Sequence, residues 1–515
     1  MKKFYALLPF LGLFLIACQD DDTPIEPDPM PDPIEYTSGS ADFTKYVAVG
    51  NSLTAGFSDN ALFRAGQEAS FPNMLATNFA LAGGGAFEIP FMADNLGGAT
   101  INGVRDANMD GADDIGNRLI LVFTADGPAP TPKAGEGSTE ITNKLSGPFN
   151  NMGIPGAKSY ELLAPGYGSL AGLAVGAANP YYVRISSAED ATVIGDAAAQ
   201  GATFFSSWIG ANDILLYATN GGSGTDRTGN PNPASYSRND ITDPTVFAGS
   251  LNGILGAMTA GGAKGVIANI PNVTDIPYFT TVPHNPVPLD EATATLLNGS
   301  YAAYNAGVAG ALNFLVGMSA ISQEDADLEI AKRTISFAAG DTNAAVLLDE
   351  DLTDLTGINS ALVNMRQATA EDLMVLTSRS FIGTLANPLD PTSINGVAVP
   401  LEDKWVLTPE EQTAINNALT AYNATIEALA TQFDLAFVDA NALLGVLKTQ
   451  GFPMADGSTV TSTFGTGGGF SLDGVHPAPR GYAILANAFI KAINEKYGSN
   501  LPDVNPLNYT GLYIE

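Results

Sequence analysis

Short apolar runs alternate with longer amphipathic segments from about residue 44 to the end of the chain. Runs rich in β-branched and aromatic residues predict strands at 46–50, 202–210, 264–270 and 435–440. Amphipathic segments predict helices at 70–82, 187–200, 243–261, 408–433 and 479–498. Short apolar strands separated by such helices are typical of a mostly parallel sheet covered on both faces. The expected fold is therefore α/β, a three-layer α/β/α sandwich around a central sheet.

Two segments depart from this alternation, and we expect both to be insertions on the core. The first, about 83–148, is polar and rich in glycine. The second, about 281–405, contains its own predicted helix at 291–316 and strand-like runs at 333–340 and 344–351. The sheet and both insertions then form one domain over 43–515.

The beginning of the chain reads as an export signal. Lys2 and Lys3 precede an apolar run over 4–17, which is shorter than the roughly 20 residues that a membrane-spanning helix needs. The single cysteine, Cys18, follows at once in "LIAC", which resembles a bacterial lipobox. This resemblance implies a signal peptide over 1–17 and a lipidated Cys18 that anchors the protein to a membrane. An ordinary signal peptide followed by a chance cysteine is the alternative.

Residues 18–42 form an acidic, Pro-rich stretch without apolar periodicity, and we expect an extended tether there. The "QDDD" after Cys18 resembles the export signal of surface lipoproteins in the Bacteroidetes group. That resemblance implies an outer-membrane lipoprotein exposed at the cell surface. An acidic linker on a periplasm-facing lipoprotein would look much the same.

Composition limits the class of partner. With 45% hydrophobic and 15% charged residues, the chain can bury a large core. Its formal net charge is -32 at pH 7, so phosphate backbones would be repelled from most of its surface. We therefore expect no nucleic-acid partner.

The first insertion carries a possible calcium loop in "DANMDGADDIGN". Its candidate ligands follow the spacing of a calcium-binding loop and are Asp106, Asn108, Asp110, Asp114 and Asn117. The last position calls for a bidentate carboxylate, which an asparagine does not supply. A structural calcium and a polar turn both stay open, and no cofactor is required by the chemistry considered next.

Candidate catalytic groups are few because the chain has only two histidines, His284 and His476. Asp473 precedes His476 by three residues, a spacing at which a carboxylate can orient the imidazole. Ser52, in "GNSLTAG", follows a predicted strand end and is a candidate nucleophile that needs such a base. Two further residues could donate hydrogen bonds to an oxyanion, namely Gly156 in "GIPGAKS" and Asn212 in "GANDIL".

The motifs around Ser52, Gly156, Asn212 and His476 occur in the order of the four blocks of the SGNH hydrolases, the GDSL esterase/lipase family. The chain resembles this family from about 42 to 498, outside the two insertions. The resemblance implies the flavodoxin-like SGNH fold and a Ser52, His476, Asp473 triad. It also implies an oxyanion hole made by the Ser52 and Gly156 backbone N–H groups with the Asn212 side chain. The expected activity is hydrolysis of carboxylic esters by a metal-independent serine esterase or lipase.

Two points qualify the resemblance. Asn51 stands where the family has aspartate, and its amide can take a similar hydrogen-bonding role. His284 lies in a Pro-rich stretch without a neighbouring carboxylate motif, so we expect a structural role. The substrate is open between a lipid ester and an acylated glycan, which leaves a carbohydrate O-acetyl esterase as an alternative. A surface lipoprotein that binds glycan or lipid without turnover is the alternative from another class.

Overall fold

Five parallel strands form the central sheet in the computed structural model, which describes residues 34–124 and 127–514. Their order across the sheet is β15 (Ala436–Val438), β8 (Lys264–Ala268), β7 (Phe204–Trp208), β1 (Tyr46–Gly50) and β6 (Asn151–Gly153). All five residues of β1 and of β7 are buried. The predicted α/β class with a central parallel sheet is confirmed.

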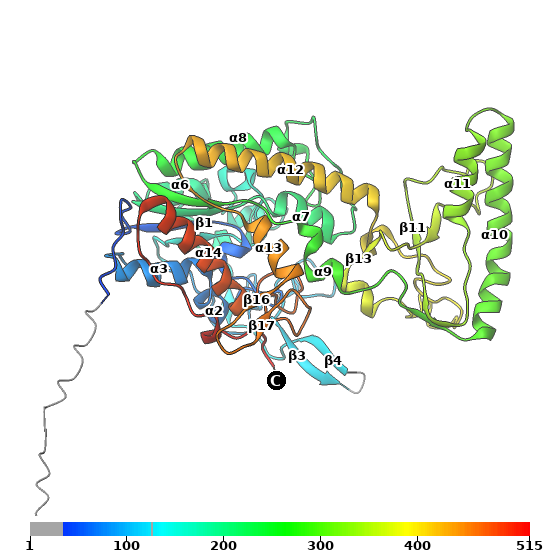
Figure 1. Cartoon of the computed structure of the whole chain (residues 1–515), viewed down its shortest axis with the longest axis horizontal. Helices are drawn as coiled ribbons and strands as arrows, with labels where there is room; N and C mark the ends of the chain where they lie inside the picture. The colour runs from blue at the N-terminus through cyan, green and yellow to red at the C-terminus, as the bar shows by residue number, and fades with distance from the viewer. Residues whose placement is uncertain (1–33, 125–126, 515) are drawn as a thin grey trace, which may run out of the picture. The chain divides into compact units, whose positions relative to one another are not determined.

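Helices cover both faces of this sheet, so its strands need apolar side chains in both directions. Val47 and Val49 of β1 belong to one buried cluster, whereas Tyr46 and Ala48 belong to another. Figure 1 shows the helices on either side of β1. The first cluster is closed by α6 (Val193–Ala198), α8 (Pro244–Thr259) and α12 (Pro409–Gln432). The second is closed by α3 (Phe71–Leu81) and α14 (Pro479–Tyr497).

Shorter helices occupy the connections. Those of the α/β core are α1 (Ser52–Ala55), α2 (Arg64–Glu68), α4 (Leu170–Leu173), α5 (Pro180–Val183), α7 (Asn212–Thr219), α9 (Pro277–Thr280) and α13 (Ala440–Thr449). Near the C-terminal end, β16 (Phe452–Pro453) pairs with β17 (Thr459–Val460).

The two segments expected to be insertions add no strand to the central sheet. Within 83–148, β2 (Ala99–Thr100) pairs with β5 (Thr139–Glu140), and β3 (Leu119–Thr124) pairs with β4 (Gly127–Pro132). The second segment has a buried core of its own between Val287 and Val397. Its elements are β9 (Val287–Leu289), α10 (Glu291–Gly317), α11 (Gln323–Arg333), β10 (Gly340–Asn343), β11 (Val346–Leu348), β12 (Met365–Gln367) and β13 (Leu373–Met374), the last pairing with β14 (Val406–Leu407).

The structure differs from the sequence analysis at three places. Strand β6 was not predicted at all. Helix α6 is shorter than 187–200, because the Thr192 side chain accepts a hydrogen bond from Gly195 N–H and caps the helix there. The run 333–340 does not form the predicted strand, and the first strand residue there is Gly340, at the beginning of β10. Its backbone groups at Ile335 and Phe337 are instead bonded by the side chains of Asn305 and Asn298 on α10, at 2.8–3.0 Å.

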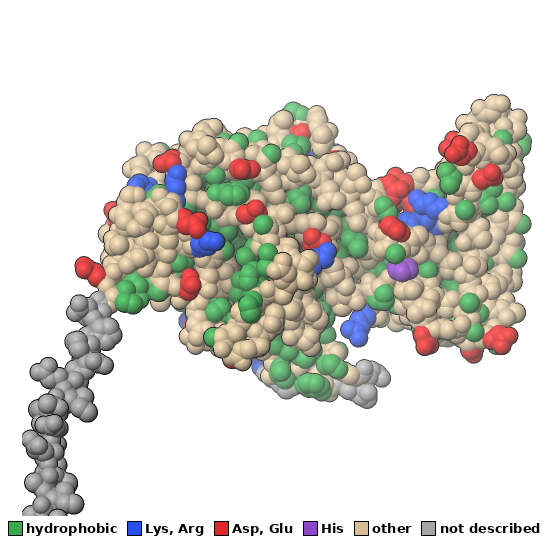
Figure 2. All heavy atoms as spheres, viewed as in Figure 1, with side chains coloured by type: hydrophobic (Ala, Val, Ile, Leu, Met, Phe, Trp, Pro, Cys, Tyr) green, Lys and Arg blue, Asp and Glu red, His purple; other side chains and the backbone are tan. Residues whose placement is uncertain are grey.

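The predicted signal peptide, Cys18 and most of the predicted tether lie outside the described residues. The last part of the expected tether is docked, because Thr37 N–H donates to Asn500 Oδ1 and Ser40 N–H donates to the carbonyl of Tyr497. Ala41 is buried, so the folded unit begins earlier than predicted. Across 34–124 and 127–514, no helix combines the length and apolar character needed to cross a bilayer. Figure 2 shows acidic side chains scattered over the face drawn there.

Helix α1 packs against the ends of β1 and β6 through two glycines. A Cβ atom at Gly50 would lie 2.2 Å from Thr54 Oγ1 and 2.3 Å from the carbonyl oxygen of Trp208. A Cβ atom at Gly153 would lie 2.3 Å from the backbone nitrogen of Ala55. The turn that carries Ser52 can therefore approach the sheet only where side chains are missing.

We expect Gly50→Ala to destabilise the protein by about 1–3 kcal/mol, because the added methyl group overpacks this contact. Gly249→Ala in α8 is the matched control, since a Cβ there meets no atom within 4 Å. The control should be neutral or stabilising by up to about 1 kcal/mol. Urea unfolding measures both, and equal stabilities of the two variants would contradict the close approach.

Candidate active site

Ser52 lies at the first position of α1, directly after β1, in a turn fixed by its neighbours. Asn51 precedes it as the N-cap, and the Asn51 side chain accepts a hydrogen bond from Leu53 N–H at 3.0 Å. Gly56 ends the helix in the left-handed region at φ 83°. Asn51 thus fills, as an amide, the capping position at which the resembled family has aspartate. The serine hydroxyl is presented at the carboxyl end of a buried parallel strand.

His476 connects Ser52 to Asp473. Its Nε2 lies 2.9 Å from Ser52 Oγ, and its Nδ1 lies 2.9 Å from Asp473 Oδ2. The ring of Phe57 packs against the imidazole with centroids 4.7 Å apart. Ser52 is 6% exposed, whereas the His476 side chain is 14% exposed. In this arrangement the imidazole can accept the serine proton, while the carboxylate orients the ring and stabilises its charged form.

Asp473 is ionised although it is nearly buried. Burial opposes its charge, but the His476 ring and the backbone N–H groups of Val475 and His476 stabilise it and hold the pKa of Asp473 at about 2. Ser471 Oγ lies 3.0 Å from Oδ1, and Asn60 N–H donates to Oδ2 at 2.9 Å. The carboxylate is therefore fixed in both charge and orientation.

Asp59 was not predicted, yet it joins the segment after Ser52 to the segment that carries His476. Its backbone N–H donates to Ser471 Oγ, and its Oδ1 accepts from Leu472 N–H, both at 2.9 Å. Asp59 is a non-glycine residue in the left-handed region at φ 51°, where backbone strain is expected. Burial, together with the nearby charge of Asp473, raises the pKa of Asp59 to about 7. Nothing in the sequence around Asp59 signals this role, because its partners lie 412 and 413 residues away.

The predicted oxyanion donors lie at the ends of neighbouring strands. Asn212, which begins α7 after β7, lines the same cavity as Ser52 and His476. One hydrogen of its side-chain amide is used at 2.9 Å by the carbonyl of Ala157, which leaves the second available. The backbone N–H groups of Ser52 and Gly156 have no acceptor within the described chain.

Gly156 lies in the turn after β6, at φ 78°. It is not among the residues that line the cavity beside Ser52. Its carbonyl accepts a hydrogen bond from Arg238, which also pairs with Glu161 at 2.7 Å. Nearby, Asp213 is buried and accepts hydrogen bonds from the backbone N–H and the hydroxyl of Ser159. Burial raises the pKa of Asp213.

His284 and the possible calcium loop are separate from this site. His284 is half-buried in the second insertion segment, and its carbonyl accepts from Ala345 N–H. In the loop, Asp106 Oδ1 and Oδ2 accept backbone N–H groups at 3.1 and 2.9 Å. Asn117, expected as the last ligand, accepts from Arg105 at 3.3 Å and donates to the carbonyls of Lys133 and Gly135 at 2.8 Å. The Asn117 amide therefore has protein partners of its own.

One group of three carboxylates within the described chain could hold a cation. Glu350, Asp403 and Glu411 have ligand oxygens within 4.8 Å of one another. Glu411 is 4% exposed, and its Oε1 has no partner among the described residues, as is also true of Asp403 Oδ1. Burial, together with the charge of Asp403, raises the pKa of Glu411 to about 9. Without a cation, this site favours a protonated Glu411.

No protein-family model, no curated protein and no solved structure matches the chain. The site is therefore characterised by its own geometry.

Because the folded-state pKa of Glu411 is raised above its unfolded value, the folded chain binds more protons between about pH 4.5 and 9. Stability from this group is complete below that window and falls as pH rises through it. Glu411→Gln should remove the loss, so in EDTA at pH 8 it should be more stable than the wild type, with a gain of up to about 1.4 kcal/mol for each pH unit above pH 4.5. The difference should vanish near pH 4.

Thermal unfolding at several pH values tests this expectation. Glu410→Gln is the matched control, because Glu410 is the neighbour of Glu411 along α12 and its own side chain is 46% exposed. The stability difference between this variant and the wild type should show no such pH dependence. A wild type that gains stability over Glu411→Gln as pH rises to 8 would contradict the burial argument.

Proposed function

We propose that the protein is a serine hydrolase of carboxylic esters, with the flavodoxin-like SGNH fold that its motifs resemble. The observation that carries the proposal is the pair of 2.9 Å contacts from His476 to Ser52 Oγ and to Asp473 Oδ2. In addition, Asn212 lines the same cavity. Ser52 and Asn212 follow the ends of β1 and β7, whereas Asp473 and His476 lie in the segment before α14. That residues so far apart in the sequence meet at one cavity supports the proposal more strongly than any one motif does.

The proposed reaction uses each group in a defined role. His476 Nε2 takes the proton from Ser52 Oγ as that oxygen attacks the ester carbonyl carbon. The oxyanion is stabilised by the Ser52 and Gly156 N–H groups and by the Asn212 amide. The imidazolium, held by Asp473, then protonates the leaving alcohol. Water then attacks the acyl carbon while His476 takes its proton. His476 returns this proton to Ser52 Oγ as the bond between Ser52 and the acyl group breaks and the carboxylic acid leaves.

We also propose a lipid-anchored location for this hydrolase, through Cys18 at the outer membrane. This rests on the lipobox-like sequence and the acidic stretch behind it. The acidic net charge of -32 favours a neutral or externally supplied ester over any nucleic acid.

A fluorophosphonate probe tests the central claim, because its phosphorus bonds to an activated serine oxygen and fluoride leaves. We expect covalent labelling of Ser52 in the wild type and none in Ser52→Ala. A glycan- or lipid-binding protein without turnover would leave the wild type unlabelled, and that result would overturn the proposal.

Asp473→Asn should lower kcat by roughly 10³–10⁴, because an amide neither fixes the required tautomer nor stabilises the imidazolium. The KM should change little. Asp456→Asn is the control, since Asp456 is exposed and bonds only within its own turn, to Ser458. Steady-state kinetics on a nitrophenyl ester measure both variants. A large rise in KM with kcat preserved would assign Asp473 to substrate binding instead.

A further inference from the structure

The cavity beside Ser52 has two chemically different parts. Its polar side chains are those of the site just described, Ser52, Asn212 and His476, together with Asn51. The remaining lining is apolar, and within the described chain no Asp, Glu, Lys or Arg side chain contributes to it. Even Trp208 has its Nε1–H occupied at 3.0 Å by the carbonyl of Asn269. A ligand in this part of the cavity would find almost no hydrogen-bonding groups.

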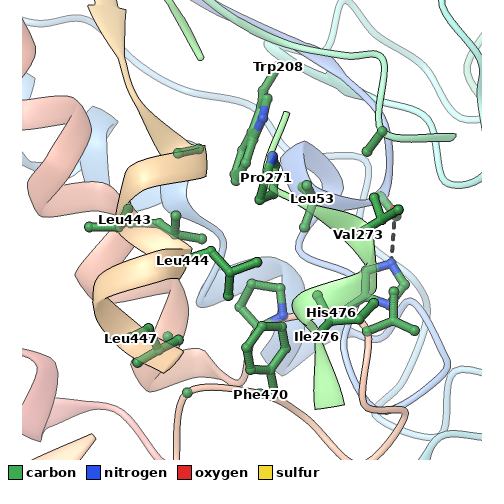
Figure 3. A pocket seen from close by; sticks show the side chains of 18 of the residues that line it. Leu53, Trp208, Pro271, Val273, Ile276, Leu443, Leu444, Leu447, Phe470 and His476 are labelled. Carbon is green, nitrogen blue, oxygen red and sulfur yellow. Dashed lines mark hydrogen bonds between the residues drawn. The ribbon is translucent and has the colours of Figure 1, made fainter. Parts of the chain in front are cut away.

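Helix α13 supplies one wall of the apolar part. Leu443, Leu444 and Leu447 line the cavity, and Figure 3 shows them on one side, with His476, Val273 and Ile276 on the other. Leu443 and Leu447 are only half-buried, so they offer apolar surface to a ligand. The beginning of α13 is fixed to the end of β8, where Asn441 N–H donates to Asn269 Oδ1 at 2.9 Å.

We propose that this cavity binds the acyl chain of the substrate, and that the natural substrate is an ester of a medium- or long-chain fatty acid. The inference rests on the proposed function and specifies its substrate. A small acetyl group would leave most of the apolar wall uncovered. Burying a hydrocarbon chain against it is favourable in proportion to the area removed from water.

The order of chemical steps assigns the cavity to the acyl group rather than to the alcohol. After the first step the acyl group stays bonded to Ser52 Oγ, while the alcohol must leave and water must take its place. The apolar part of the cavity has almost no hydrogen-bonding groups, so it is a poor route for water. It is suited to the group that remains throughout both steps.

A series of p-nitrophenyl esters from acetate to decanoate tests the proposal in the wild type. We expect kcat/KM to rise about fourfold for each added methylene until the cavity is filled. A series of alkyl acetates from methyl to octyl should show no comparable rise. A flat acyl series, a preference for acetate, or a rise confined to the alcohol series would each overturn the assignment.

Leu447→Glu tests the wall itself, because it places a carboxylate where the chain should lie. We expect the ratio of kcat/KM for decanoate to that for acetate to fall at least tenfold. Leu389→Glu is the matched control, because Leu389 is 92% exposed and lies outside the cavity, and it should keep the wild-type ratio. An unchanged ratio in a folded Leu447→Glu chain would overturn the assignment of this wall.

Binding gives a readout that needs no turnover. Decanoate should bind to the Ser52→Ala chain in isothermal titration calorimetry, and the addition of Leu447→Glu should weaken that binding at least tenfold. No binding to Ser52→Ala overturns the acyl cavity. If Ser52 is labelled by fluorophosphonate and acetate is hydrolysed, but the acyl series is flat or decanoate does not bind, the proposed function stands while the acyl assignment fails. If Ser52 is not labelled, the proposed function fails, and the acyl assignment that rests on it fails with it.

Discussion

A carboxylate that is nearly excluded from water must be compensated by hydrogen-bond donors, and the arrangement of the site depends on how Asp473 meets this need. Its donors come from two separate parts of the chain, with Asn60 on one side and Val475 and His476 on the other. The same ion therefore orients the imidazole and ties its segment to the segment after Ser52. Asp59 and Ser471 reinforce this junction.

The second constraint is steric, and it determines where Ser52 can lie. Gly50 and Gly153 let α1 settle on the sheet at distances that a side chain would forbid. A parallel sheet gathers its functional groups at the carboxyl ends of its strands, and close packing brings Ser52 within reach of His476 there. The hydrogen bonds of Asp473 thus hold the segment of His476 in place, and the two glycines let Ser52 approach it.

The sequence predicted the parts of this fold that carry a local pattern. Strands β1, β7, β8 and β15 are apolar runs, and the Asp473 to His476 spacing is local. Strand β6, Asn-Met-Gly, has no such pattern, because its extended form depends on pairing with β1. The run 333–340 predicted a strand, but asparagines of α10 bond its backbone at Ile335 and Phe337 instead. Asp59 was not predicted because its partners lie 412 and 413 residues away. The cavity wall of α13 was not predicted because the apolar face of a helix has the same sequence pattern whether it packs on the core or on a ligand.

The contact between Ser52 and His476 spans 424 positions of the chain, which has a consequence for the order of events during biosynthesis. Ser52 is among the first folded residues to be made, whereas His476 precedes α14, the last helix that covers the sheet. Until α14 and the segment before it have joined the sheet, Ser52 has no partner to accept its proton. In the proposed mechanism, Ser52 therefore becomes reactive only when the fold is complete.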